Sequence, residues 1–270
     1  MSSSLVCIYN GPGAADVSDY QNAYSKILSK DYNFQYINAT DIIEKDILTN
    51  CELFVMPGGA DLPYCEALNG TGNNKIKAYV ERGGKYLGTC AGAYYGSAFV
   101  LYDEKDQVNQ RIKGPRALKF CPGVARGPLF QSIPHAEGYD FPISVPVCLN
   151  KGLDANYTTT DKCCSLYYFG GPFFCDIGYF TEGRYITILA DYWLEDTEKL
   201  FLNPEESYHY SNKGKSLPAI VYTQVKRGKA VLTGVHLENS LFDKENNPQG
   251  LTREKLLKII FKKLGLKTKK

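Results

Sequence analysis

The amino-acid sequence predicts an α/β fold built on a doubly wound, mostly parallel sheet with a β-rich insertion. Short apolar runs alternate with amphipathic helical stretches from residue 5 to residue 92, a pattern typical of βα units. Several of these runs end directly at glycine or proline, as parallel strands do at their carboxyl ends. From about residue 103 the pattern changes to short strands rich in aromatic residues. We therefore expect residues 1–270 to form a single domain with a β-rich elaboration at about 103–215.

The spacing of apolar residues locates the individual elements. Strands are expected at residues 5–9, 32–37, 53–56 and 85–88. Helices are expected at residues 18–30, from residue 40 and at 73–82, where apolar residues recur every three or four positions. Shorter strands follow at 166–172 and 185–190, and a hairpin is expected from 219–224 and 230–233. Three βα units in succession favour the doubly wound arrangement.

The last eighteen residues combine an apolar stripe with many lysines. Leu256, Leu257, Ile259, Ile260, Phe261 and Leu264 have helical spacing. One interpretation is a final helix that packs its apolar stripe against the domain and exposes its lysines. The alternative is a tail that binds lipid or an acidic partner.

Composition excludes several classes of protein. The chain has 31 basic and 29 acidic residues, a net charge of +2, which does not favour nucleic acid as a partner. No run approaches the ~18 apolar residues of a membrane helix, and the N-terminus lacks the features of a signal peptide, so we expect no membrane partner. Nine scattered cysteines in a chain of this size indicate a reducing compartment without structural disulfides, and we expect a cytoplasmic protein. With three histidines and no CxxC pair, we expect no metal site, and no cofactor.

The sequence Gly88-Thr89-Cys90-Ala91-Gly92 lies at a predicted junction between a strand and a helix. It has the form of a nucleophile elbow with cysteine in place of serine. A nucleophile on such a tight turn projects above the sheet, and the flanking glycines remove Cβ atoms that would collide there. The N-terminus of the following helix favours the thiolate. We therefore predict that Cys90 is a catalytic nucleophile, with a buried core thiol as the alternative.

A thiolate needs a proton-transfer partner, and the chain offers His135, His209 and His236. His135 lies in a proline-flanked loop and His209 in a polar stretch, whereas His236 follows a predicted strand and precedes Glu238 by two residues. Strand ends of a doubly wound sheet converge on one crevice. We predict a catalytic triad of Cys90, His236 and Glu238, with the carboxylate holding the imidazole. The alternative for His236 is a structural role at a strand end.

The sequence Pro57-Gly58-Gly59-Ala60-Asp61 follows the third predicted strand. Paired glycines after a strand can turn backbone N–H groups toward an anion. We predict that Gly58 and Gly59, with the N–H of Ala91, form an oxyanion hole; the alternative is a simple tight turn.

With these motifs, the chain resembles class I glutamine amidotransferases, a flavodoxin-like α/β family, and in particular the N-terminal domain of fungal-type biotin-protein ligases and its stand-alone relatives. The matching stretches, spread over nearly the whole chain, are residues 6–13, 56–64, 83–94, 120–128 and 227–236. The biotin-transferring part of those ligases lies in further domains, so we expect that this chain alone does not ligate biotin. No ammonia-accepting domain is evident either, so any acceptor or ligase site would belong to a protein partner.

Further polar residues are candidates for binding a small amide or a carboxylate-containing substrate. They are Asn10 at the end of the first strand, Asp61 and Tyr64 after the glycine pair, Tyr94 after the predicted elbow, and Arg126 in a matching stretch. Arg126 is a candidate clamp for a substrate carboxylate, with an ordinary surface arginine as the alternative. Glutamine amidotransferases usually carry a His-Gln pair just after the elbow, where this chain has Ala93-Tyr94-Tyr95. This departure puts glutamine as the substrate in doubt.

Three hypotheses of function follow. The first is a cysteine-dependent amide hydrolase or amidotransferase-like enzyme that uses the triad. The second is a catalytically inert binding or regulatory module that serves a separate biotin-protein ligase. The third, a nucleotide- or flavin-binding protein, rests on residues 10–13 alone, which lack a full G-x-G-x-x-G motif.

Overall fold

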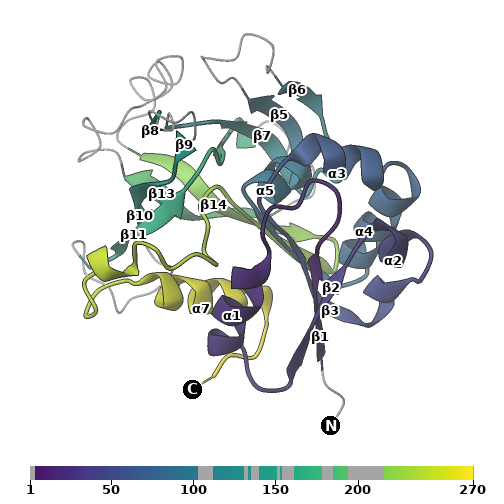
Figure 1. The fold of residues 1–270 in the computed structure, drawn as a ribbon, viewed down its shortest axis with the longest axis horizontal. Helices are drawn as coiled ribbons and strands as arrows, with labels where there is room; N and C mark the ends of the chain where they lie inside the picture. The colour runs from purple at the N-terminus through teal and green to yellow at the C-terminus, as the bar shows by residue number, and fades with distance from the viewer. Residues whose placement is uncertain are drawn as a thin grey trace.

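The computed structural model describes residues 4–102, 112–130, 133–134, 140–150, 153, 161–177, 185–193 and 216–269. It confirms the α/β fold class, with a large sheet and helices on both faces (Figure 1). The described strands form a nine-stranded sheet in the order β11-β10-β13-β14-β15-β4-β3-β1-β2, a four-stranded sheet in the order β12-β7-β5-β6, and the pair β8–β9.

The N-terminal half of the large sheet is parallel. Its strands are β1 (Ser4–Tyr9), β2 (Tyr32–Ile37), β3 (Cys51–Met56), β4 (Lys85–Thr89) and, returning late in the chain, β15 (Gly228–Thr233). Alternate residues of β1 enter opposite cores, Val6 and Ile8 on one face and Cys7 and Tyr9 on the other. This two-sided burial explains why these strands appear in the sequence as continuous apolar runs.

Helices cover both faces of this parallel half. In Figure 1, α1 (Ser18–Ile27) and α7 (Arg253–Leu264) lie on one side of β1–β3, and the other helices lie on the opposite side. The latter are α2 (Ala39–Ile43), α3 (Asp61–Ala67), α4 (Thr71–Glu81) and α5 (Ala91–Gly96), with the 3₁₀ turn η1 (Ile47–Asn50) between α2 and β3. The sequence analysis did not predict α3, which begins directly after the glycine pair.

The rest of the large sheet is antiparallel. It comprises β10 (Ile143–Leu149), β11 (Cys163–Tyr168), β13 (Ile186–Trp193) and β14 (Ser216–Val225). The predicted hairpin is confirmed, since β14 and β15 pair with Val225 opposite Gly228. The small sheet consists of β5 (Ser97–Tyr102), β6 (Ile112–Pro115), β7 (Cys121–Gly127) and β12 (Phe173–Cys175). The remaining pair is β8 (Ile133–Pro134) with β9 (Asp140–Phe141).

The C-terminal helix α7 packs against the domain, as the first of its two interpretations predicts. Thr252 caps its N-terminus and Gly265 ends it in the left-handed conformation. The predicted apolar stripe is buried apart from Ile259, which is half-buried, and the Phe261 ring meets that of Tyr24 on α1 with centroids 5.1 Å apart. No helix in the described ranges is long and apolar enough to cross a bilayer.

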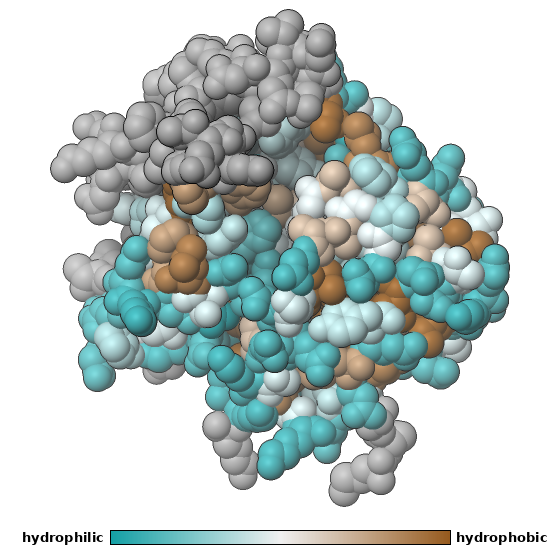
Figure 2. Space-filling model, viewed as in Figure 1, coloured by the Kyte–Doolittle hydropathy of each residue, from teal (hydrophilic) through white to brown (hydrophobic). Residues whose placement is uncertain are grey.

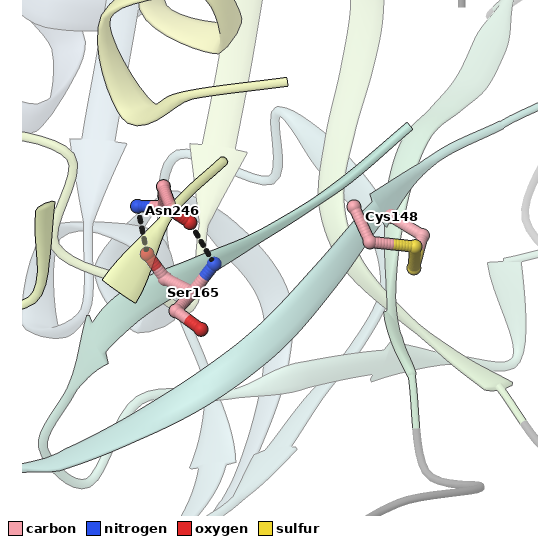
Figure 3. The surroundings of a disulfide bond; sticks show 4 residues. Cys148, Ser165 and Asn246 are labelled. Atoms are coloured by element: carbon pink, nitrogen blue, oxygen red, sulfur yellow. Dashed lines mark hydrogen bonds between the residues drawn. A yellow bond between two sulfur atoms is a disulfide. The ribbon is translucent and has the colours of Figure 1, made fainter. Parts of the chain in front are cut away.

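A disulfide joins neighbouring strands β10 and β11. Cys148 and Cys163 face each other in the antiparallel ladder and are bonded (Figure 3). The expectation of a chain without disulfides is therefore wrong for this pair, because strand register, which sequence spacing does not reveal, brings the two sulfurs together. On β11, Ser165 also exchanges two backbone hydrogen bonds with the Asn246 side chain, of 2.6 and 3.1 Å, which Figure 3 shows beside the disulfide.

Candidate active site

A cleft of about 1050 Å³ opens at the carboxyl ends of β3, β4 and β15. Its walls come from the turns after these three strands, from the start of α1 and α3, from the end of β11 and from the small sheet. The face drawn in Figure 2 is hollowed near its centre, with hydrophobic residues on both sides of the hollow. Ligands of doubly wound folds bind at this edge of the sheet.

Cys90 lies in this cleft, at the junction of β4 and α5. Its backbone has a positive φ, which is rare for a residue other than glycine, with φ 49° and ψ −106°. A Cβ atom at Gly88 would lie 2.5 Å from the Gly92 carbonyl oxygen, and one at Gly92 would lie 2.1 Å from that of Met56. Both glycines of the motif are thus required by close backbone packing. A non-glycine residue held in this conformation is a feature that clusters at functional sites.

His236 and Glu238 lie beside Cys90, on the segment that follows β15. Nδ1 of His236 is 2.6 Å from Oε1 of Glu238, and the two side chains are 14% and 7% exposed. Burial of the ring opposes its protonation, but the charge of Glu238, together with contacts to Glu238 and Cys90, raises the pKa of His236 to about 10. The imidazole is therefore held as a cation at neutral pH.

The turn between β3 and α3 brings Gly58 against both side chains. A Cβ atom at Gly58 would lie 2.7 Å from Cε1 of His236 and 3.5 Å from Cβ of Cys90. Nε2 of His236, the ring nitrogen that Glu238 does not engage, is buried and has no hydrogen-bond partner among the described residues. The thiol of Cys90 donates a hydrogen bond of 3.4 Å to the Phe169 carbonyl. The structure thus brings Cys90, His236 and Glu238 together.

The three backbone N–H groups predicted to form an oxyanion hole differ in their availability. The N–H of Gly58 donates to Oη of Tyr20 at 3.0 Å, so it is already engaged. Gly59 lies opposite Ala14 in an antiparallel bridge, but the neighbours of these two residues make the hydrogen bonds of the bridge. The N–H of Gly59 therefore has no partner in the described structure. The N–H of Ala91 is likewise without a partner there. Gly59 and Ala91, both in the cleft wall, remain the two free donors.

Glycine is required at position 59. Its φ is +134°, and a Cβ atom would lie 2.0 Å from the Gly13 carbonyl oxygen. Tyr64, predicted to bind substrate, instead supports this turn from below: its hydroxyl donates to the carbonyls of Pro57 and Gly58 at 3.2 and 3.0 Å. Tyr64 is fully buried and is not part of the cleft wall.

The other predicted substrate-binding residues fall into two groups. Asp61 and Tyr94 line the cleft, where Asp61 is paired with Nε of Arg116 at 2.7 Å and the Tyr94 hydroxyl donates to the Gly170 carbonyl at 3.1 Å. Asn10 is exposed outside the described cleft lining, and Arg126 lies on β7 outside it as well. His135 and His209 lie outside the described residues.

Sequence reasoning missed Arg253, which shapes the site from a distance. Arg253 at the start of α7 is 2% exposed, donates to the Leu237 carbonyl at 2.8 Å and makes two bonds of 2.8 Å to Asp243. It therefore holds the residue between His236 and Glu238. No signal in the sequence separates Arg253 from the other basic residues of this helix. In the described part of the chain, no three His, Cys, Asp or Glu side chains gather as a metal site.

Comparison with known proteins identifies the family. A family model described as the N-terminal part of biotin-protein ligase matches residues 4–270. The biotin-protein ligase of Schizosaccharomyces pombe is 31% identical over 98% of this chain and 38% of its own length. The chain belongs to the biotin-protein ligase N-terminal family. An uncharacterized protein of Chlamydia muridarum is 33% identical over 69% of this chain and 60% of its own length.

This family member spans less than two thirds of either of those curated relatives. Its fold matches that of solved amidotransferase structures. One crystal structure of a glutamine amidotransferase superposes with a TM-score of 0.55 at 17% identity, covering 97% of this chain and 99% of the other. PurLQS from Thermotoga maritima gives a TM-score of 0.51 at 14% identity, with the same coverage. These likenesses establish the amidotransferase-like fold.

Proposed function

We propose that this biotin-protein ligase N-terminal family member is a cysteine-dependent amide hydrolase or amidotransferase-like enzyme. The observation that carries the proposal is that Cys90, whose backbone φ is positive, lies beside the imidazolium of His236. Nδ1 of this imidazolium is 2.6 Å from Oε1 of Glu238. An imidazolium beside a cysteine favours the thiolate, which is the nucleophilic form. Glu238 stabilises the cation and holds the ring tautomer.

In the proposed reaction, the Cys90 thiolate attacks the carbonyl carbon of an amide. The N–H groups of Gly59 and Ala91 stabilise the negative oxygen of the tetrahedral intermediate. His236 gives its proton to the nitrogen as the C–N bond breaks, so that a neutral amine leaves and a thioester remains on Cys90. Water then attacks the thioester as the now neutral His236 takes its proton, the C–S bond breaks, and the carboxylic acid is released with the Cys90 thiolate and the His236 imidazolium restored.

Glutamine is not favoured as the substrate. Ala93, Tyr94 and Tyr95 stand where glutamine amidotransferases usually carry a His-Gln pair, and they serve packing: Ala93 and Tyr95 are fully buried, and Tyr94 bonds to the Gly170 carbonyl. The same observation favours the second candidate function, an inert binding module that acts with a protein partner carrying a ligase or acceptor site.

Reaction with iodoacetamide, followed by peptide mass spectrometry at neutral pH, tests the activation of Cys90. We expect Cys90 to be alkylated at least tenfold faster than Cys65, a free and partly exposed cysteine of the same chain. His236→Gln should remove the difference without affecting Cys65. Equal rates for the two cysteines in the wild-type protein would contradict the proposal.

A panel of amides then separates the two candidate functions. We expect amine or ammonia release that is lost in both Cys90→Ala and Glu238→Gln. Turnover that depends on Cys90 excludes the inert module. Rapid alkylation of Cys90 without turnover of any amide favours the module instead.

A further inference from the structure

The charges along the cleft are unevenly distributed. Asp61 is neutralised by Arg116, and Glu238 by the imidazolium of His236. Asp16 and Asp19, at the start of α1, also line the cleft; both are exposed, and neither forms an ion pair with a described residue. The backbone N–H of Ser18 donates to Oδ1 of Asp16 at 2.9 Å, and the Ser18 side chain also bonds to this carboxylate. This end of the cleft is therefore anionic.

The anionic end lies on the side of His236. The Tyr167 ring stands 5.1 Å from the imidazole, centroid to centroid, and burial, then the charges of Glu238, Cys90 and Asp19, raise the pKa of Tyr167. Asp19 also directly precedes Tyr20, whose hydroxyl accepts from the Gly58 N–H at 3.0 Å, and a Cβ atom at Gly58 would lie 2.7 Å from Cε1 of His236. Oε2 of Glu238, in a side chain that is 7% exposed, has no hydrogen-bond donor in the described structure, and the imidazolium is the one cation that the described lining residues place on this side of the cleft.

The part of the cleft wall that the small sheet and α5 form is apolar. Tyr94 and Tyr102 meet edge to face with centroids 5.7 Å apart, and Val100 of the same sheet completes this wall. Leu62 and Phe169, 43% and 42% exposed, also face the cleft. Large apolar side chains left open in a concave site indicate a ligand that covers them.

The proposed reaction indicates which portion of the substrate each end of the cleft binds. His236 protonates the leaving nitrogen, so the amine portion of the substrate lies on its side, and the acyl portion extends away from it. We infer that the substrate is an amide that joins an apolar acyl group to an amine carrying a second, positive charge, which Asp16 and Asp19 bind. This inference rests on the proposed function for the orientation of the amide. Lys113, on β6 of the small sheet, is the one lysine or arginine among the described lining residues, and it belongs to the apolar end.

Three benzoyl amides of similar length test the inference: N-benzoyl-cadaverine, which is cationic, N-benzoyl-pentylamine, which is neutral, and N-benzoyl-aminohexanoate, which is anionic. Their binding is measured by calorimetry on the Cys90→Ser variant, so that the result does not depend on turnover. We expect the cationic amide to bind about two- to tenfold more tightly than the neutral one at low salt, as two solvent-exposed charge pairs allow. The anionic amide should bind most weakly.

The combined variant Asp16→Asn and Asp19→Asn should abolish this preference. Glu44→Gln, which removes an exposed carboxylate outside the cleft, should retain it. Replacing benzoyl by acetyl should weaken binding of the cationic amide in all of these variants, because the apolar wall is then left uncovered.

Equal binding of the three amides, tighter binding of the anionic one, or no binding at millimolar concentration overturns the inference. Hydrolysis of the same amides by the wild-type enzyme shows whether the inferred substrate class or the proposed function has failed. Hydrolysis that requires Cys90 but ignores the charge of the amine leaves the hydrolase intact and refutes the substrate class. A charge preference in binding without any hydrolysis supports the assigned ends of the cleft and refutes the hydrolase.

Discussion

Gly58→Ala is the substitution that tests the geometry of the site most directly. Its new methyl group would lie 2.7 Å from Cε1 of His236, whereas carbon atoms in contact are about 3.5–4.0 Å apart. The imidazole must therefore move by about 1 Å, because Gly58 is held on its other side by the hydroxyls of Tyr20 and Tyr64. The φ of Gly58 lies outside the left-handed region, so alanine itself fits the backbone.

A misplacement of about 1 Å can cost roughly 100-fold in rate, which corresponds to about 2.7 kcal/mol of transition-state stabilisation. We expect kcat/KM for amide hydrolysis to fall by this factor and the alkylation of Cys90 to slow markedly. Overpacking should lower the free energy of unfolding by about 1–3 kcal/mol. The protein should remain folded.

Gly70→Ala is the matched control. A Cβ atom at Gly70 has no neighbour within 4 Å, and its φ of +64° makes alanine cost about 1–2 kcal/mol. The control variant should thus lose comparable stability while keeping wild-type alkylation and turnover. If folded Gly58→Ala protein is alkylated at Cys90 as fast as wild type, the imidazole is not where our reasoning requires it.

Three further predictions concern the buried pairs. Asp61→Asn should lower the free energy of unfolding by about 3–5 kcal/mol in urea, because it leaves the 7%-exposed Arg116 without its carboxylate; a loss below about 1 kcal/mol would contradict this. The pKa of His236 is about 10 when folded and 6.5 when unfolded, so its contribution to stability is complete below pH 6.5 and disappears as the pH rises to about 10. Glu238→Gln should flatten this dependence in denaturation series across that range, and parallel curves for the two proteins would refute the assignment. Without reductant, Cys148→Ser should lower the free energy of unfolding by about 3 kcal/mol, because the disulfide joins residues with a sequence separation of 15. With reductant present, the variant and the wild-type protein should be equally stable.

Local patterns in the sequence predicted the parallel half of the fold well. The strand expected at residues 32–37 is β2, and the one at 85–88 ends one residue short of β4. Alternation of apolar runs and amphipathic helices is a local property of the sequence. It predicts these strands correctly because each of them is buried on both faces and so appears as a continuous apolar run. The helix α3 escaped prediction because Pro63 and the preceding glycine pair mask its start.

The site was harder to predict where it depends on pairings between distant segments. Proximity of Cys90 and His236 followed from the rule that strand ends converge, and the structure brings them together. The engagement of Gly58 by Tyr20, and of Asp61 by Arg116, has no counterpart in local spacing. Arg126 and Asn10, plausible by position in the chain, fall outside the cleft lining for the same reason.

By itself, the sequence determined the α/β class, the order of the βα units and the turn that carries Cys90, since these follow from periodicity and from residues only a few positions apart. Only the tertiary structure decided which backbone N–H groups are free, which carboxylates are neutralised and which end of the cleft is anionic. The engagement of the Gly58 N–H by Tyr20 spans 38 positions of chain, and the pairing of Asp61 with Arg116 spans 55. Such contacts are created by packing of the whole domain, and no local pattern encodes them.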